Sequence, residues 1–234
     1  MRKFETYITN GEYRVGCTGQ TVYLFDKDNT ELAKFRDLKY AYQAAFSPKG
    51  DVFVVRSNEG RLAVYHLAER RLIMKFRYAK GKDGKQPQDS NGCFSPDGEQ
   101  FYIIVYRADL CSSLLIYRTS DFSLEKRLFD GGNMVLSFIE YDPETERFYL
   151  LGFFRNGLHI DNSYFVGRLD GDSLADMEYI SEDEYSFYRD YKNIEATGFT
   201  SKSSFAGYYD IGNLKEHKHT LAKLWLCCYN KRRP

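Results

Sequence analysis

The chain has 234 residues, in which 33 Lys and Arg balance 33 Asp and Glu, and 17% of the residues are aromatic. This balance removes the overall field that would recruit nucleic acid or a membrane surface, so we expect neither as a partner. The aromatic content favours strands and argues against disorder. The length allows one large all-β domain or two small ones, and the repeats below favour a single domain over residues 1–234.

The ends of the chain and its cysteines bear on location. Met1 to Thr6 lacks the apolar core of a signal peptide, and no apolar run approaches the ~18 to 20 residues that span a bilayer. No Cys-x-x-Cys spacing occurs among the five cysteines, Cys17, Cys93, Cys111, Cys227 and Cys228. We therefore expect reduced thiols, no structural metal, no cofactor and a cytoplasmic location.

Short strand-like segments separated by turn residues begin near the start of the chain. Two units, approximately residues 2–37 and 38–77, contain the clearest of them. The predicted strands are Tyr13–Cys17, Thr21–Phe25, Glu31–Phe35, Tyr40–Phe46, Asp51–Arg56, Arg61–His66 and Arg71–Phe76. Because the turns between them are short, each unit is expected to be an up-and-down antiparallel sheet.

One turn sequence marks the repeat. Phe46-Ser47-Pro48-Lys49-Gly50 returns as Phe94-Ser95-Pro96-Asp97-Gly98, 48 residues later, and Tyr141-Asp142-Pro143-Glu144 takes its place in the next unit. Lys80–Asp89, between the second and third units, is expected to be a surface loop. The third and fourth units, approximately residues 90–130 and 133–181, have predicted strands at Gln100–Tyr106, Leu114–Tyr117, Leu124–Phe129, Arg147–Phe154, Tyr164–Leu169 and Met177–Ile180. A period of about 45 residues predicts a repeat architecture.

A fifth unit, approximately residues 192–230, is predicted after these four. Its strands are expected at Ala196–Thr200, Ser204–Ile211 and His219–Cys228, and a fourth strand is missing. This unit would therefore be incomplete, either with three strands or completed by a second copy of the chain. Both a monomer and a dimer are consistent with this pattern.

An aromatic residue late in the third strand of a unit completes the pattern, at Phe25, Tyr65, Tyr117 and Trp225. The pattern resembles the WD-repeat type of β-propeller, whose blades read a Phe-Ser-Pro-Asp-Gly turn and then a strand that ends on Trp-Asp. Phe25-Asp26 is the nearest match to that pair, and the Gly-His dipeptide of the family is absent. The resemblance implies an all-β propeller of four-stranded antiparallel blades, with five blades and the last incomplete. An open twisted sheet or a two-sheet sandwich is the structural alternative.

The motifs of common enzymes are absent. The sequence has no Gly-x-Ser-x-Gly elbow, no phosphate-binding Gly-x-x-x-x-Gly-Lys and no His-Glu-x-x-His. Glu216-His217-Lys218-His219 would place two imidazoles on one strand face, but two ligands of one type are weak support for a metal site, and an exposed polar loop is preferred. We therefore favour a non-enzymatic function.

Arginine recurs at the end of the second strand in three successive units, at Arg56, Arg107 and Arg155. In a propeller these strand ends emerge on one face. Three converging guanidinium groups would form an anion site for a phosphate, a carboxylate or an acidic peptide. The alternative is that each arginine pairs locally, for instance with Glu59 or Asp109.

Tyrosines lie in or beside the loops expected on that face. Tyr40, Tyr185, Tyr188 and Tyr191 are the candidate binding residues, the last three within the acidic and aromatic segment Glu182–Tyr191. Tyr and Arg are enriched in protein-binding hot spots. We expect a non-enzymatic scaffold that binds a protein or peptide through this loop face.

A second function stays open. Propeller enzymes gather carboxylates around the axis, and Glu5, Asp89, Glu140 and Glu195 lie in or next to the predicted innermost strands. A propeller that binds a small molecule or glycan, with hydrolysis by two of these carboxylates, is the alternative.

Overall fold

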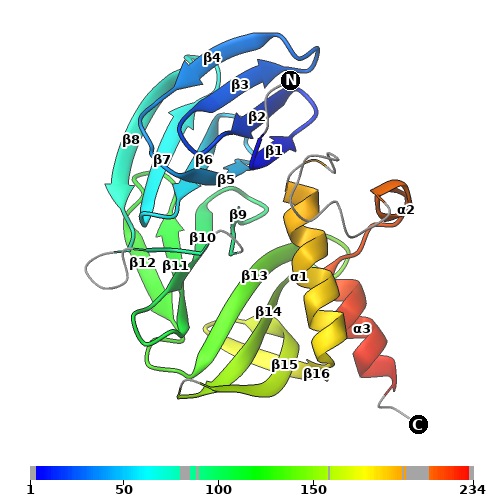
Figure 1. Ribbon diagram of the computed structural model, residues 1–234. Helices are drawn as coiled ribbons and strands as arrows, with labels where there is room; N and C mark the ends of the chain where they lie inside the picture. The colour runs from blue at the N-terminus through cyan, green and yellow to red at the C-terminus, as the bar shows by residue number, and fades with distance from the viewer. Residues whose placement is uncertain are drawn as a thin grey trace. The chain divides into compact units, whose positions relative to one another are not determined.

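The computed structural model describes residues 4–79, 85–87, 90–157, 159–196, 198 and 211–231 (Figure 1). Sixteen strands in this part of the chain form four four-stranded sheets, and in each sheet consecutive strands are neighbours. All pairings are antiparallel, as expected for strands that are joined by short turns. The predicted all-β class with four-stranded antiparallel units is therefore confirmed.

The chain divides into two compact units, of which the first comprises Met1–Gln88 and Asn193–Glu216. It contains two sheets and a short helix. The first sheet is β1 (Thr6–Thr9), β2 (Tyr13–Cys17), β3 (Val22–Asp26) and β4 (Glu31–Phe35). The second sheet is β5 (Ala41–Phe46), β6 (Val52–Ser57), β7 (Arg61–His66) and β8 (Arg71–Arg77), and the helix is α2 (Ile211–Glu216).

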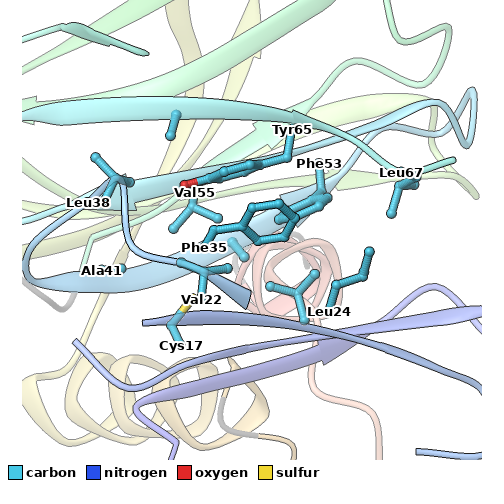
Figure 2. Close-up of a cluster of buried hydrophobic side chains, with 13 residues drawn as sticks. Cys17, Val22, Leu24, Phe35, Leu38, Ala41, Phe53, Val55, Tyr65 and Leu67 are labelled. Atoms are coloured by element: carbon cyan, nitrogen blue, oxygen red, sulfur yellow. The ribbon is translucent and has the colours of Figure 1, made fainter. Parts of the chain in front are cut away.

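The core of the first unit lies between these two sheets. Alternate residues of a strand point to one face, so Val22 and Leu24 of β3 are buried while Tyr23 between them is only half-buried. Figure 2 shows them facing Phe53 and Tyr65 of the second sheet. Tyr65, one of the predicted third-strand aromatics, is fully buried, and its ring stacks on Phe53 at 4.9 Å.

The second unit comprises Asp89–Lys192 and His217–Pro234. Its first sheet is β9 (Gly92–Phe94), β10 (Gln100–Tyr106), β11 (Ser112–Arg118) and β12 (Leu124–Leu128). Its second sheet is β13 (Met134–Asp142), β14 (Arg147–Asn156), β15 (His159–Asp170) and β16 (Ser173–Ile180). Helix α3 (Leu221–Lys231) belongs to this unit, and helix α1 (Glu182–Ala196) runs from it into the first unit.

The repeated Ser-Pro sequences form the predicted turns. The N–H of Gly50 donates to the carbonyl of Ser47 at 3.0 Å, and that of Gly98 donates to Ser95 at 2.9 Å. Both glycines have φ near +70°, at 72° and 70°, which side chains disfavour. Each turn reverses the first strand of its sheet into the second.

The predicted fifth blade is wrong where the structure describes it. The expected strand His219–Cys228 is occupied by α3, so Trp225 is a helical residue and does not mark a third strand. The buried residues of α3, Leu221, Leu224, Trp225 and Cys228, recur at the spacing of one helix face. The expected strands Ala196–Thr200 and Ser204–Ile211 lie almost entirely outside the described residues.

The expected loop at Glu182–Tyr191 is also wrong, because these residues begin α1. Ser181 and Glu184 form a capping box: the N–H of Glu184 donates to the Ser181 hydroxyl at 3.2 Å, and the N–H of Ser181 donates to the Glu184 carboxylate at 2.9 Å. None of the helices in the described ranges is both long and apolar enough to span a bilayer.

Helices cover one face of the β13–β16 sheet (Figure 1). Tyr185 of α1 and Trp225 of α3 are buried against residues of this sheet, including Tyr149 and Tyr164. The indole N–H of Trp225 donates to the carbonyl of Asp176 at 2.5 Å. The apolar face of this sheet is thus buried by helices, where a repeat of sheets alone would use a further sheet.

Candidate functional site

Arg56 is a buried arginine at the end of β6, in the first unit. Its Nε donates to the hydroxyl of Tyr78 at 2.9 Å, and its Nη2 donates to the carbonyl of Pro87. Both partners belong to the segment that follows the fourth strand of the same sheet. Arg56 therefore holds this segment against the end of β6.

Arg107 has the same place in the second unit, directly after β10, and is also buried. Its Nη2 donates to Asp109 at 2.8 Å and to the carbonyl of Gly132 at 2.6 Å. Its Nη1 donates to the carbonyls of Phe129 at 2.9 Å and Ser112 at 3.2 Å. Arg107 thus joins its own turn to the segment after β12, which is the arrangement that Arg56 makes in the first unit.

Arg155, the third member of the series, is half-buried near the end of β14. Its main chain pairs with Asn133: the N–H of Arg155 donates to the Asn133 carbonyl at 2.9 Å, and the Asn133 side chain donates to the Arg155 carbonyl at 3.2 Å. The local pairing of Arg107 with Asp109 that the sequence left as an alternative is present. The buried donors of Arg56 and Arg107 are used within the protein, which gives these two residues a positioning role.

Tyr185, Tyr188 and Tyr191 lie on α1 and pack within the second unit. The Tyr185 hydroxyl is 2.6 Å from that of Ser137, and its ring lies 4.7 Å from Tyr164. Tyr191 is buried, with its ring 4.8 Å from that of His219. Burial raises the pKa of the half-buried Tyr188 to about 12. These three tyrosines therefore dock α1 onto its neighbours.

Tyr40 differs from the other candidate tyrosines, because 49% of it is exposed. It precedes β5 and has φ at +54°, in the left-handed region. Its carbonyl accepts a hydrogen bond of 3.1 Å from the N–H of Asn58, and the next residue, Ala41, exchanges two backbone hydrogen bonds with Gly19, at 2.9 and 3.2 Å. The main chain on both sides of this aromatic ring is therefore held in place.

Main-chain hydrogen bonds link three segments of the first unit in series, from Arg36–Tyr40 through Asn58 to Ser57–Gly60, and from Gly60 to Tyr78–Ala79. We call them together the Tyr40 surface; its exposed residues include Arg36, Lys39 and Tyr40, while Ser57, Gly60, Tyr78 and Ala79 are buried beneath it. The N–H groups of Tyr78 and Ala79 donate to the carbonyl of Gly60 at 2.9 and 3.2 Å. Arg56 lies beneath this surface, because its Nε binds the Tyr78 hydroxyl. The sequence had located Tyr40 and Arg56 as candidates but gave no indication of their different roles.

The carboxylates considered for hydrolysis belong to both units where the structure describes them. Glu5 and Glu195 belong to the first unit and Glu140 to the second, while Asp89 lies outside the described residues. Glu140 forms an ion pair of 3.0 Å with Lys192, and its second oxygen accepts the N–H of Leu221 at 2.9 Å. Glu140 is thus engaged in binding the two helices.

The histidines and cysteines show no metal-binding arrangement in the part of the chain that the structure describes, where no group of three or more potential ligands occurs. His217 and His219 lie between α2 and α3, not on a strand. All five cysteines are free thiols, and burial raises the pKa of Cys17 to about 12. A fully buried thiol with a raised pKa is unreactive.

Comparison with known proteins extends the description of the fold. The sequence matches no protein-family model and no curated protein. Hydrazine synthase of Kuenenia stuttgartiensis matches in structure with a TM-score of 0.60 and 14% identity, over 74% of this chain and 47% of that one. The WD40 domain of coronin from Toxoplasma gondii matches with a TM-score of 0.56 and 16% identity, over 72% and 43% of the two chains.

A third structure, U3-55K, has a TM-score of 0.54 and 9% identity, over 76% of this chain and 52% of that one. The chain thus spans about half the length of the solved structures that it matches. At these identities the likeness concerns the fold alone. Together with the four-stranded antiparallel sheets, it shows a fold of the β-propeller type, as the sequence predicted.

Proposed function

We propose that this protein is a non-enzymatic scaffold that binds a protein or peptide through the Tyr40 surface. The observation that carries the proposal is the conformation of Tyr40: a large aromatic residue is exposed in a backbone region that glycine adopts more easily. For a residue other than glycine, this region costs roughly 1 to 2 kcal/mol. Strained residues persist where the surrounding structure holds them, and they concentrate at binding sites.

The surroundings of Tyr40 support this role. The hydrogen bonds from Asn58 to Tyr40 and between Ala41 and Gly19 fix the main chain before any partner arrives. A preorganised surface loses less conformational entropy on binding than a flexible loop. The ring supplies apolar area and a hydroxyl group, and Arg36 and Lys39, also exposed, flank it.

Peptide selection against the full chain tests the proposal. A displayed library of random peptides is selected on the immobilised protein, and the affinities of the enriched peptides are measured for three proteins: the wild type, Tyr40→Gly and Tyr179→Ala. Glycine relieves the strain at Tyr40 while it removes the ring. Tyr179 is the matched control, because it is 51% exposed and lies on β16, in the other unit.

We expect the selected peptides to bind the wild type and Tyr179→Ala equally, and to bind Tyr40→Gly at least about tenfold more weakly, as for other aromatic hot spots. Circular dichroism and thermal unfolding establish that both variants are folded. Peptides that bind all three proteins with one affinity would contradict the assignment of this surface. Failure to enrich any peptide would count against the function itself.

A further inference from the structure

The end of the β7–β8 ladder that borders the Tyr40 surface is basic. Arg61 of β7 lies directly opposite Arg77 of β8 in the strand register, so the two side chains share one face of the sheet. Lys75, two residues before Arg77, lies opposite Ala63 on the same face. The Nζ of Lys75 donates to the carbonyl of Asp37 at 3.0 Å, which places this strand end against the segment Arg36–Tyr40.

The positive charges in this cluster are poorly compensated. Like charges directly opposite each other destabilise a pair of strands. Within the described part of the chain, the Nε of Arg61 is buried without a hydrogen-bond partner, and the Arg77 side chain donates only to the Glu59 carbonyl, at 3.4 Å. Arg36 and Lys39 have no ion-pair or hydrogen-bond partner for their side chains among the described residues.

Two carboxylates lie nearby, and the first is that of Asp37, whose main-chain carbonyl binds Lys75. Burial, followed by the charge of Asp37, raises the pKa of Tyr65. The hydroxyl of Tyr65 is located near Leu38 in Figure 2. Glu59 is the other carboxylate in the Tyr40 surface. Among the described residues of this region, five cationic side chains (Arg36, Lys39, Arg61, Lys75 and Arg77) thus outnumber the two acidic ones, in a chain with a net charge of zero.

We infer that the partner is an acidic extended peptide, whose Asp or Glu carboxylates bind Arg61, Arg77 and Arg36 while an apolar residue contacts Tyr40. This inference rests on the proposed function and adds the chemical class of the partner. A guanidinium group binds a carboxylate through two parallel hydrogen bonds, and Arg36 and Arg77 expose theirs to solvent while Arg61 adds its positive charge beside Arg77.

A peptide fits this surface better than a nucleic acid. Binding of single-stranded nucleic acid relies on a series of aromatic rings along a charged groove and on a broad positive field. Among the exposed large apolar residues that the structure describes, Tyr40 alone belongs to this surface, and the chain as a whole has no net charge. The local charge is confined to one strand end and one loop.

Titration of defined peptides into the full chain tests the inference. A short fluorescent peptide of alternating Glu and Ala residues is compared with its Gln–Ala counterpart by fluorescence anisotropy. The variants are Arg77→Glu, Arg61→Gln and the control Arg147→Glu. Arg147 is an exposed arginine at the first residue of β14, in the other unit.

We expect the Glu–Ala peptide to bind at least about tenfold more tightly than the Gln–Ala peptide, with an affinity that falls as salt is added. Arg77→Glu should weaken it by about fivefold or more, whereas Arg147→Glu should leave it unchanged. Because Arg61 is half-buried, the stability of Arg61→Gln is also measured by thermal unfolding. If that variant is unstable, Arg77→Glu still tests the inference, because Arg77 is exposed.

Two further probes separate other anions from carboxylates. A peptide with a single phosphoserine and a short oligouridylate are titrated in the same way. If either binds through Arg77 while the Glu–Ala peptide does not, the assignment to an acidic peptide is overturned. Equal binding of the Glu–Ala peptide to wild type and Arg77→Glu also overturns it.

The two proposals fail in different ways. Selected peptides that require Tyr40 but are neutral, insensitive to salt and unaffected by Arg77→Glu would refute the acidic partner and leave the scaffold function standing. Binding of the Glu–Ala peptide that requires Arg77 but not Tyr40 would support the anion site and contradict the role given to Tyr40.

Discussion

The Nζ of Lys192 lies 3.0 Å from Oε1 of Glu140, and Oε2 of Glu140 accepts the N–H of Leu221 at 2.9 Å. One carboxylate of β13 therefore binds α1 through its side chain and α3 through its first main-chain N–H group. A negative charge at a helix N-terminus is favourable, and the buried ammonium of Lys192 requires a counter-charge.

We expect Glu140→Gln to lower the free energy of unfolding by about 3 kcal/mol, because it leaves the Lys192 ammonium buried without its counter-charge. Urea unfolding measures this, with Trp225, the single tryptophan of the chain, as the fluorescent probe of the helices on this sheet. Glu144→Gln, at an exposed position in the following turn, should have almost no effect. Adding Lys192→Met to Glu140→Gln should recover part of the loss. Equal stability of Glu140→Gln and wild type would contradict the role of this ion pair.

The hydrogen bonds of Arg107 affect the pKa of the neighbouring Asp109. The hydrogen bond from Arg107, followed by that from the Cys111 N–H, holds the pKa of Asp109 below its ordinary value of 3.8. A folded-state pKa below the unfolded one stabilises the protein above about pH 4, and this contribution is lost as the pH falls through the folded value. NMR titration of Asp109 should show the low pKa, and Arg107→Met should return it towards 3.8. The pKa of Asp121, lowered by Ser123, is the control that should stay unchanged.

Tyr40→Gly should leave the free energy of unfolding unchanged or raise it by up to about 1 kcal/mol, because relief of the left-handed strain offsets the flexibility of glycine. Tyr179→Gly removes an equally exposed ring from a strand and should lower stability by about 1 kcal/mol. Chemical denaturation compares the two. A loss at Tyr40 as large as that at Tyr179 would mean that the Tyr40 ring supports the fold.

Two strand glycines should differ in their tolerance of a methyl group. A Cβ at Gly152 would lie 2.5 Å from the carbonyl oxygen of Val135, in the neighbouring strand, whereas one at Gly16 would lie 2.5 Å from the ring of Phe4. The main chain of Val135 is held by the hydrogen bonds of the sheet, so it cannot shift as easily as the Phe4 ring can rotate. We therefore expect Gly152→Ala to cost about 3 kcal/mol and Gly16→Ala about 1 kcal/mol, by thermal or chemical unfolding. A reversed order would contradict the described packing.

The repeat was predictable because its signals are local. Phe46 to Gly50 and Phe94 to Gly98 form the expected turns, since Pro fixes its φ angle and Gly allows the positive φ that ends the turn, wherever they occur. The aromatic residues Phe25, Tyr65 and Tyr117 lie late in third strands as expected. Alternating apolar residues and short turns decide these sheets with little help from distant parts of the chain.

Helices α1 and α3 were not predicted, although the sequence contains a signal for each of them. Ser181 and Glu184 have the spacing of a capping box, and Thr220 precedes apolar residues that recur every three to four positions. The repeat predicts a fifth sheet and therefore a strand through the apolar run that contains Trp225. Periodicity at 3.6 residues would have separated the two interpretations.

The candidate site was less predictable than the fold. The recurrence of Arg56 and Arg107 reflects a shared position, but their partners are main-chain carbonyls that only the folded loops bring close. The pairing of Arg61 with Arg77 depends on strand register, which a bulge between Val64 and Tyr65 shifts. The sequence contains no signal that predicts this shift in register.

The arginine contacts at the loop ends have a consequence for how this protein can diverge. Arg56 and Arg107 bind the carbonyls of Pro87, Phe129 and Gly132, and a carbonyl is present whatever side chain its residue carries. Substitutions on these linking segments therefore leave the hydrogen bonds from Arg56 and Arg107 intact, as long as the conformation of the main chain is unchanged. The conformation of these loops thus depends little on their side chains. Single substitutions can therefore change what the loops bind, in evolution or in the laboratory, without altering the framework that holds them.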